Sequence, residues 1–153
     1  MKKKFKDIFS YYEFNKKKKK ISDLLFICDH ASNNIPKSYK NLGLNKKDIE
    51  SHIGWDIGAK AITLNLTKKL ESSCFLSNFS RLIVDPNRKI NDFDLIPKRS
   101  FGKKIPLNEN ISFDERFLRI KKYYDIYHEN LKKIIKRKIS DGYKLKLISI
   151  HSF

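Results

Sequence analysis

Two short apolar runs in this chain each lead into a polar segment that contains a histidine. Residues 24–28 (LLFIC) run into Asp29 and His30, and residues 147–150 (LISI) run into His151. Because helical patterns flank both runs, we expect them to be strands of a parallel sheet that is covered on both faces. Such sheets bind ligands beyond the carboxyl ends of their strands. The sequence therefore predicts an α/β fold in which His30 and His151 belong to one site.

The chain between these runs alternates strand and helix patterns, as βαβ units do. Asn45 is expected to cap a short helix that ends at Glu50. A longer helix is predicted from about Ile53 to Leu70, with His52 and Asp56 one turn apart beside its apolar stripe. The stripe itself is predicted to contain Ile53, Ile57, Ala61 and Leu64.

Two further apolar segments follow this helix. Residues 74–76 are predicted to form a second strand, and residues 82–84 form a third apolar segment that ends in the sequence DPNR. Residues 89–111 show little periodicity and are longer than most connections in compact domains, so we expect a lid or a substrate loop there.

The last predicted helix begins with a capping box, in which Ser112 and Glu115 each satisfy a free N–H group of the first turn. It extends to about Lys138 and ends before Asp141 and Gly142. Its predicted apolar stripe contains Phe113, Phe117, Tyr124, Leu131 and Ile135.

The chain has 153 residues, which suits one domain, and a formal net charge of +17. We predict a basic N-terminal helix or arm over residues 1–20 that packs on the domain edge and ends in the lysine run 16–20, and a folded domain over residues 21–153. Lysine is spread along the whole chain without interleaved stacking aromatics, so we expect no specific nucleic-acid partner. The sequence has neither a long apolar run nor a signal peptide, and we expect a cytoplasmic protein without a membrane partner.

The two cysteines, Cys28 and Cys74, lie inside predicted strands without CxxC spacing. This arrangement favours reduced core thiols over a disulfide framework. The composition leaves the oligomeric state open.

His30 and His151 are the strongest candidates for metal ligands. A hydrolytic zinc takes about three protein ligands and lowers the pKa of a bound water toward ~7. The third ligand stays open among Asp29, Asn33 and Asp56. Asn33 stands where a carboxylate would complete a His-x-x-Glu pattern, and an amide is a poor zinc ligand.

Two arginines, Arg81 and Arg88, stand near predicted strand ends. A guanidinium binds a carboxylate in bidentate fashion, so an acidic small molecule could be held there. The alternative for Arg88 is an ion pair with Asp85 that shapes the turn.

Five blocks of this sequence, taken in order, resemble those of the N-formylglutamate amidohydrolase family. The blocks are CDHASN (28–33) with Ile35-Pro36, HIGWDIGA (52–59), SRLIVDPNR (80–88), Glu115-Arg116 with Tyr127-His128, and ISIHSF (148–153). The resemblance spans about residues 21–153. It implies a three-layer fold like that of the zinc exopeptidases, with a mostly parallel sheet between helices.

The resemblance also implies the chemistry: zinc-assisted hydrolysis of N-formyl-L-glutamate, or of a similar small acidic N-acyl amino acid, as in histidine degradation. It implies that His30 and His151 bind Zn²⁺ and that Asp56 and Glu115 have catalytic roles. The residues that it implies for substrate binding are Ser32, Asn33, Arg81, Asn87 and Arg88.

Members of this family continue past the HSF block, so we expect this chain to be the N-terminal part of the catalytic domain. The part beyond Phe153 would supply the general base, and we therefore expect the 153-residue chain alone to be impaired. Its last strand would lie at a sheet edge with an uncovered apolar face. Two alternatives are the same fold acting on another amide, such as a cell-wall peptide, and a basic module that binds polyanions through its lysine runs.

Overall fold

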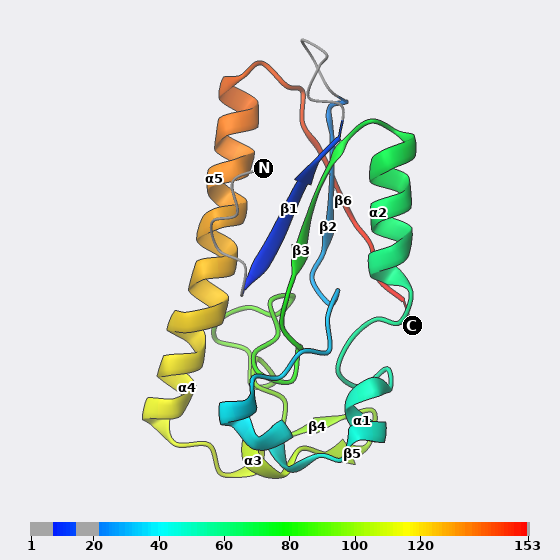
Figure 1. The fold of residues 1–153 in the computed structure, drawn as a ribbon. Coiled ribbons are helices and arrows are strands. Elements are labelled where there is room, and N and C mark those ends of the chain that lie inside the picture. Colours follow the sequence, from blue (N-terminus) through cyan, green and yellow to red (C-terminus); the bar gives the residue numbers. More distant parts are fainter. Residues whose placement is uncertain (1–7, 15–21, 153) are drawn as a thin grey trace.

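A computed structural model of the chain describes residues 8–14 and 22–152. Its main sheet has four strands in the order β1-β3-β2-β6 (Figure 1). Strands β2 (Leu24–Cys28), β3 (Ser73–Ser77) and β6 (Lys146–Ser149) run parallel, and β1 (Phe9–Glu13) lies antiparallel to β3. The prediction of a mixed α/β fold with a mostly parallel sheet is confirmed.

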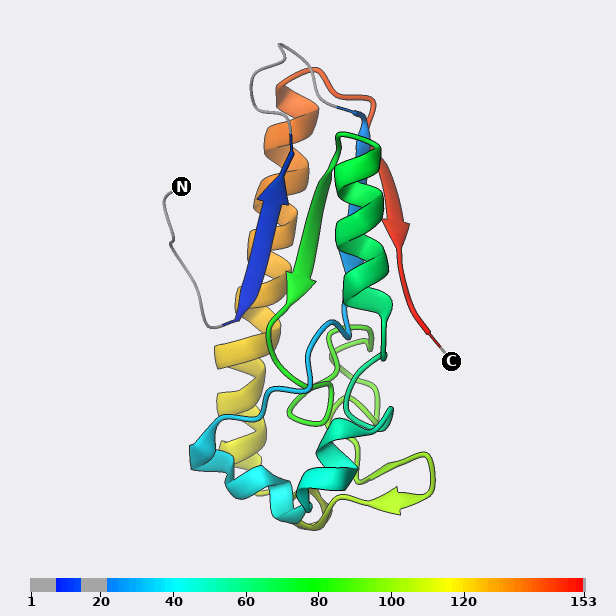
Figure 2. The same cartoon turned by 45° about the vertical axis from the view of Figure 1, so that its right-hand side comes forward.

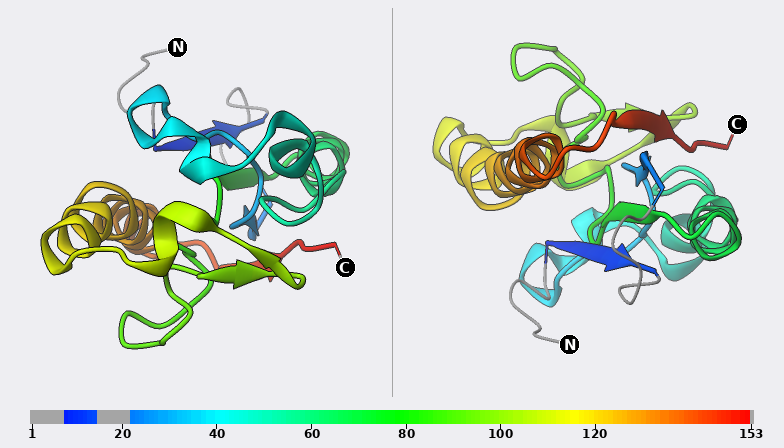
Figure 3. Two further views of the ribbon diagram at one scale, coloured as in Figure 1. Left: turned by 90° about the horizontal axis from the view of Figure 1, so that it is seen from below. Right: turned by 90° about the horizontal axis from the view of Figure 1, so that it is seen from above.

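Helices cover both faces of this sheet. Helix α2 (Ala59–Lys69) lies on one face. On the other face, α4 (Phe113–Arg119), the π-helical segment η2 (Ile120–Asp125) and α5 (Ile126–Ser140) follow one another as a single long helix. Figure 3 shows α2 and this long helix on opposite sides of the strands.

The apolar run in β2 is explained by its central place in the sheet. Successive side chains of a strand point to opposite faces. Leu25 and Ile27 belong to the core cluster shared with the long helix, whereas Phe26 and Cys28 belong to a second cluster that includes Ala59 of α2. Because both faces are covered, the strand has no polar side, and its pattern is continuous rather than alternating.

The predicted cysteine state and the predicted helix starts agree with the structure. Both cysteines are buried and free. The side chain of Asn45 accepts the N–H of Asp48 at 2.9 Å at the start of α1 (Lys46–Glu50). The hydroxyl of Ser112 accepts the N–H of Glu115 at 3.2 Å at the start of α4, which is half of the predicted capping box.

The helix predicted from Ile53 to Leu70 is wrong at its N-terminal end. Residues 51–58 form turns and bends, and α2 begins only after Gly58, whose φ of 85° lies in the left-handed region that glycine tolerates. His52 and Asp56 therefore lie in a loop and are not one turn apart on a helix.

The predicted apolar stripe is correct only in part. Ile53 is buried and Leu64 packs against the core. Ile57 and Ala61 are exposed, whereas Thr63 and Thr67 are buried. The hydroxyl of Thr63 donates to the carbonyl of Ala59 at 2.7 Å, and that of Thr67 donates to the carbonyl of Thr63 at 2.6 Å. Both hydroxyls bond to their own helix, so these threonines can face the core without an unmet polar group.

The extent of the long helix was predicted correctly, but its stripe only in part, since Tyr124, Leu131 and Ile135 pack against the core and the two phenylalanines do not. Phe113 and Phe117 are exposed, whereas Tyr123 and Tyr127 are fully buried. The wide π-helical turn of η2 lies between the two halves of this helix and shifts the phase of any regular 3.6-residue pattern.

Two charged residues of the long helix are buried as well. Arg119 donates to Glu115 at 2.7 Å and to the side chain of Asn108 at 2.7 Å. Lys138, only 1% exposed, donates to Glu13 of β1 at 3.0 Å. Each charge is buried together with an acceptor, which is the condition under which burial of an ion is tolerated.

The segments that follow β3 contain little regular structure. Residues 82–84 are fully buried but lie in a turn and in no strand. The long connection over residues 89–111 carries a short hairpin of β4 (Arg99–Ser100) and β5 (Lys103–Lys104), and then α3 (Pro106–Glu109). Together with η1 (Lys37–Gly43) and α1, these elements lie below the carboxyl ends of the parallel strands in Figure 1.

Both edges of the sheet bear on the predictions. The aromatic segment 9–13 forms strand β1 and not a helix, while residues 1–7 and 15–20 of the predicted arm lie outside the described residues. Strand β6 is the other edge (Figure 2), and Leu147 is 51% exposed, as expected for an uncovered strand. Among the described helices, none has the length and apolar character needed to cross a membrane.

Candidate metal centre

The two strand-end histidines meet at one end of the sheet, as predicted. Strands β2 and β6 are parallel neighbours, with Ile27 opposite Ser149, so the residues that follow them leave the sheet side by side. The ring centroids of His30 and His151 lie 5.1 Å apart.

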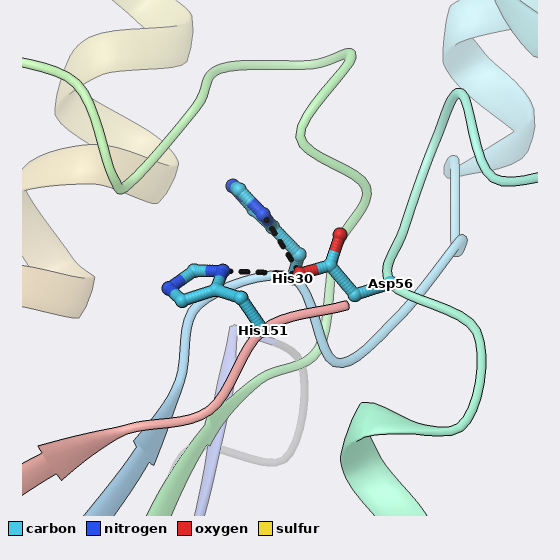
Figure 4. Close-up of side chains that lie close together, drawn as sticks. All are labelled: His30, Asp56 and His151. Atoms are coloured by element: carbon cyan, nitrogen blue, oxygen red, sulfur yellow. Dashed lines mark hydrogen bonds and ion pairs between the residues drawn. The ribbon is translucent and has the colours of Figure 1, made fainter. Parts of the chain in front are cut away.

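Asp56 completes a cluster with these histidines (Figure 4). Its Oδ2 lies 3.0 Å from His151 Nδ1 and 3.5 Å from His30 Nδ1. One potential ligand atom from each residue lies within 4.8 Å of the others. Tetrahedral zinc with bonds of about 2.1 Å would hold its ligands about 3.4 Å apart. The three side chains are therefore close enough to hold one metal ion.

A nonlocal contact brings Asp56 to this position. Its backbone N–H donates to the carbonyl of His30 at 3.0 Å, and Ser80 Oγ donates to the carbonyl of Gly54 at 2.8 Å. Gly54 is buried, and a Cβ on it would lie 3.1 Å from the Ser80 hydroxyl. The loop over residues 51–58 is thus fastened to the segments that follow β2 and β3.

Asp85 fixes the orientation and the tautomer of His30. Its Oδ1 lies 2.7 Å from His30 Nε2, and both side chains are buried. Burial alone would raise the pKa of Asp85, but the hydrogen bonds that its carboxylate makes with His30 and with the backbone N–H of Asn87 outweigh it, and the pKa is lowered. An ionised carboxylate only accepts, so Nε2 carries the proton and Nδ1 of the neutral ring presents its lone pair toward Asp56.

His151 has a more adaptable environment. Its Nε2 lies 3.0 Å from Ser149 Oγ and 3.7 Å from Asp29 Oδ2. A hydroxyl can donate or accept. The proton of His151 can therefore sit on Nε2, which frees the Nδ1 lone pair for a cation.

Arg81 holds the cluster from the loop side. Its Nη1 donates to Asp56 Oδ1 at 3.1 Å and lies 3.2 Å from His30 Nδ1, a contact with which a bound cation would compete. Its Nε and Nη2 donate to the carbonyls of Ile53 and His52 at 3.2 and 2.5 Å. The guanidinium that was expected to grip substrate is thus largely occupied by protein partners.

The other two candidates for the third ligand lie outside the cluster and have other partners. Asp29 Oδ1 accepts a 2.6 Å hydrogen bond from Tyr127, whose pKa is raised by burial and by the charge of Asp29. The amide of Asn33 donates to the carbonyl of Ile49 at 3.3 Å. Of the three residues left open by the sequence, Asp56 is the one in the cluster.

A cavity of about 450 Å³ opens next to the cluster. Of the predicted substrate-binding residues, Arg81, Asn87 and Arg88 line it, whereas Ser32 and Asn33 do not. Ser32 instead lines a different hollow, and its Oγ accepts the N–H of Asn34.

Glu115, predicted to be catalytic, does not line this cavity either, and its carboxylate is bound by Arg119. The alternative pairing of Arg88 with Asp85 is not found. Arg88 Nε lies 3.0 Å from Asp94, and Asp85 instead serves His30.

Three cavity residues that the sequence reasoning did not single out are Asp94, Arg99 and Phe101. They come from the long irregular connection over residues 89–111, which the sequence did mark as a substrate loop. Asp85 directly follows the apolar run 82–84. This position was the feature of the sequence that could have indicated a carboxylate that orients a histidine.

His128 lies outside the cluster. Its Nε2 is 3.0 Å from the carbonyl of Pro86, its ring packs on Tyr124 at a centroid distance of 4.3 Å, and burial lowers its pKa.

Comparison with known proteins supports a specific family. The sequence model of the N-formylglutamate amidohydrolase family matches residues 22–153. The crystal structure of gene product Atu2144 from Agrobacterium tumefaciens superimposes with a TM-score of 0.89 at 32% sequence identity, over 96% of this chain. This chain spans 57% of the length of that structure. A search of curated proteins gave no match.

Proposed function

This chain belongs to the N-formylglutamate amidohydrolase family, and on that basis we propose that it acts as a zinc-dependent hydrolase of N-formyl-L-glutamate, or of a similar N-acyl amino acid, giving formate and glutamate. The observation that carries the proposal is the cluster of His30, Asp56 and His151 beside a cavity lined by arginines. Because the chain spans 57% of the length of the matched structure, the activity of the whole protein is a proposal.

The donor set fits zinc. Two imidazoles and one carboxylate are ligands that this metal takes in hydrolytic sites, and a site with three protein ligands leaves a position open. A zinc ion there would polarise a water molecule and the carbonyl of the scissile amide.

The chain's own groups prepare the site for that role. Asp85 holds the proton of His30 on Nε2, and Arg81 holds Asp56 through Oδ1, so that Oδ2 faces the imidazoles. Hydrogen bonds of this kind orient ligands and typically contribute 10- to 100-fold to metal affinity.

The cavity suits a small acidic substrate. Arg88 and Arg99 supply cationic groups, and the Asn87 side chain lines the cavity beside them. Arginine forks match the planar geometry of carboxylates.

Three broader assignments extend the proposal. The fold is taken to be that of the zinc exopeptidases, which is supported by a site at the carboxyl ends of parallel strands between helix layers. We also propose a cytoplasmic location and a role in histidine degradation; the family assignment supports the latter.

Metal analysis of the purified protein tests the proposal. We expect near-stoichiometric zinc in the wild type and its loss in His30→Ala and His151→Ala. His52→Ala is the matched control, because His52 is exposed and lies outside the cluster. Retention of zinc in both cluster variants would show that the metal binds elsewhere. Release of formate from N-formyl-L-glutamate by the full-length protein is the accompanying assay of activity.

A further inference from the structure

The three arginines that line the cavity differ in what already binds them. Arg81 is held by Asp56 and by two backbone carbonyls. Arg88 is paired with Asp94. The guanidinium of Arg99 makes no hydrogen bond or ion pair with any of the residues that the structure describes, yet it lines the same cavity as the metal cluster.

The backbone that carries Arg99 is nevertheless held in place. The neighbouring Ser100 donates its hydroxyl to the carbonyl of Ile53 at 2.8 Å. On the opposite strand of the hairpin, Lys103 pairs with Asp48 of α1 at 3.0 Å. The β4–β5 hairpin is therefore tied both to the loop that supplies Asp56 and to α1.

Phe101, at the tip of this hairpin, adds a third attachment. Its ring lies 4.6 Å from the ring of His52 and 5.5 Å from the guanidinium carbon of Arg81. The hairpin thus packs against the residue that positions the metal ligands, and Arg99 extends from a fixed base.

The ion pairs of the cavity also single out Arg99. Arg81 and Arg88 are each neutralised by a carboxylate at about 3 Å, Asp56 and Asp94 respectively. Asp85, the third carboxylate of the cavity, is bound to His30. The guanidinium of Arg99 therefore has no carboxylate partner among the described residues, and a carboxylate of a ligand would supply one. A guanidinium can bind such a group through two parallel hydrogen bonds.

We propose that Arg99 is the residue that selects an acidic substrate, by binding a carboxylate of the N-acyl amino acid while the amide lies at the His30–Asp56–His151 cluster. The identity of this ligand rests on the proposed function; the carboxylate-binding role of Arg99 does not.

The test uses Arg99→Gln, which removes the charge and keeps a polar side chain. Its matched control is Lys98→Gln, which removes a charge from the adjacent residue, one that does not line the cavity. Binding of glutarate and of its neutral analogue glutaramide is measured by calorimetry with zinc present. Hydrolysis of N-formyl-L-glutamate and N-formyl-L-glutamine is measured in parallel with the full-length protein.

We expect Arg99→Gln to weaken glutarate binding about 10- to 100-fold, the range for a hydrogen bond to a charged group, and to lower kcat/KM for the acidic substrate by a similar factor. Glutaramide binding and turnover of the neutral substrate should change less than about twofold. Lys98→Gln should behave as wild type.

Failure of this inference and failure of the proposed function give different results. Unchanged glutarate binding in Arg99→Gln, equal weakening of the acidic and neutral ligands, or no glutarate binding by the wild type would overturn the role of Arg99. Glutarate binding that depends on Arg99, without hydrolysis of either formyl substrate, would leave that role standing and refute the proposed activity.

Discussion

Replacement of Asp85 tests whether the metal cluster depends on its outer hydrogen bonds. Asp85 and His30 are both buried, and the 2.7 Å bond between them fixes the proton on Nε2. Asp85→Asn keeps the shape and one acceptor oxygen but removes the charge, whereas Asp85→Ala removes the acceptor. Loss of such a partner costs about 10- to 100-fold in metal affinity, or about 1.4–2.7 kcal/mol. We expect about a 10-fold loss of zinc affinity in Asp85→Asn and about a 100-fold loss in Asp85→Ala.

The assay is a competition for zinc between each variant and a chromophoric chelator at fixed pH. Asp92→Asn is the matched control, because its carboxylate accepts a backbone N–H in a turn and does not line the cavity. Thermal unfolding followed by circular dichroism shows whether each variant is folded, since Asp85 also accepts the N–H of Asn87 at 2.8 Å. If folded Asp85→Ala binds zinc as tightly as Asp92→Asn does, the reasoning about His30 is refuted.

Two further predictions concern the core. Glu13→Gln should lower the free energy of unfolding by about 3 kcal/mol, the low end for breaking a buried ion pair, because Lys138 is buried while Glu13 is partly exposed. The pKa of Glu13 is lowered from its ordinary value of 4.5, because its hydrogen bonds and cationic neighbours outweigh burial. The ion pair therefore stabilises the fold fully above about pH 4.5, and this stabilisation is lost as the pH falls through the lower pKa of Glu13 in the folded protein. Urea titrations measure the free energy of unfolding of wild type and variant at each pH. A difference between the two that did not shrink in acid would contradict this prediction. Burial raises the pKa of Cys28 to about 12, and Cys74 is buried as well. We therefore expect neither thiol to react with a thiol reagent at pH 8 until urea unfolds the chain. Fast reaction of the native protein would count against the described core.

The parts of the fold that the sequence predicts are those decided by local pattern and by burial. Residues 24–28 read as a central strand because both faces of β2 are apolar. The meeting of His30 and His151 followed from one rule, that parallel strands present their carboxyl ends at the same edge. Neither inference needed knowledge of the loops.

Asp56 was harder to assign, because its position depends on contacts distant in sequence. The spacing of Ile53 and Ile57 suggests a helix, yet Ile53 is buried and Ile57 is exposed, since the loop between them turns toward the backbone of His30. A helical period cannot report a contact with a residue on another strand.

The burial of two charged residues of the long helix was not predicted from the sequence, for a related reason. Arg119 and Lys138 occupy core positions only because Asn108 and Glu13 bring acceptors from other elements. A hydrophobicity pattern assigns such residues to the surface and places Phe113 in the core instead. Hydrophobic periodicity takes no account of a hydrogen-bond acceptor from another part of the chain, which allows a charged side chain to be buried.

The two oxygens of Asp56 have separate partners, and this division accounts for the shape of the site. Oδ1 accepts from Arg81, while Oδ2 faces both imidazoles and accepts the N–H of Ser152 at 3.2 Å. An arginine is suited to this role because its planar fork reaches the carboxylate and two backbone carbonyls at once, which the point charge of a lysine cannot do. With Arg81 bound to Asp56, the proposed recognition of an acidic substrate would need another cation, and Arg99 on the anchored hairpin is the cavity arginine that we propose for it.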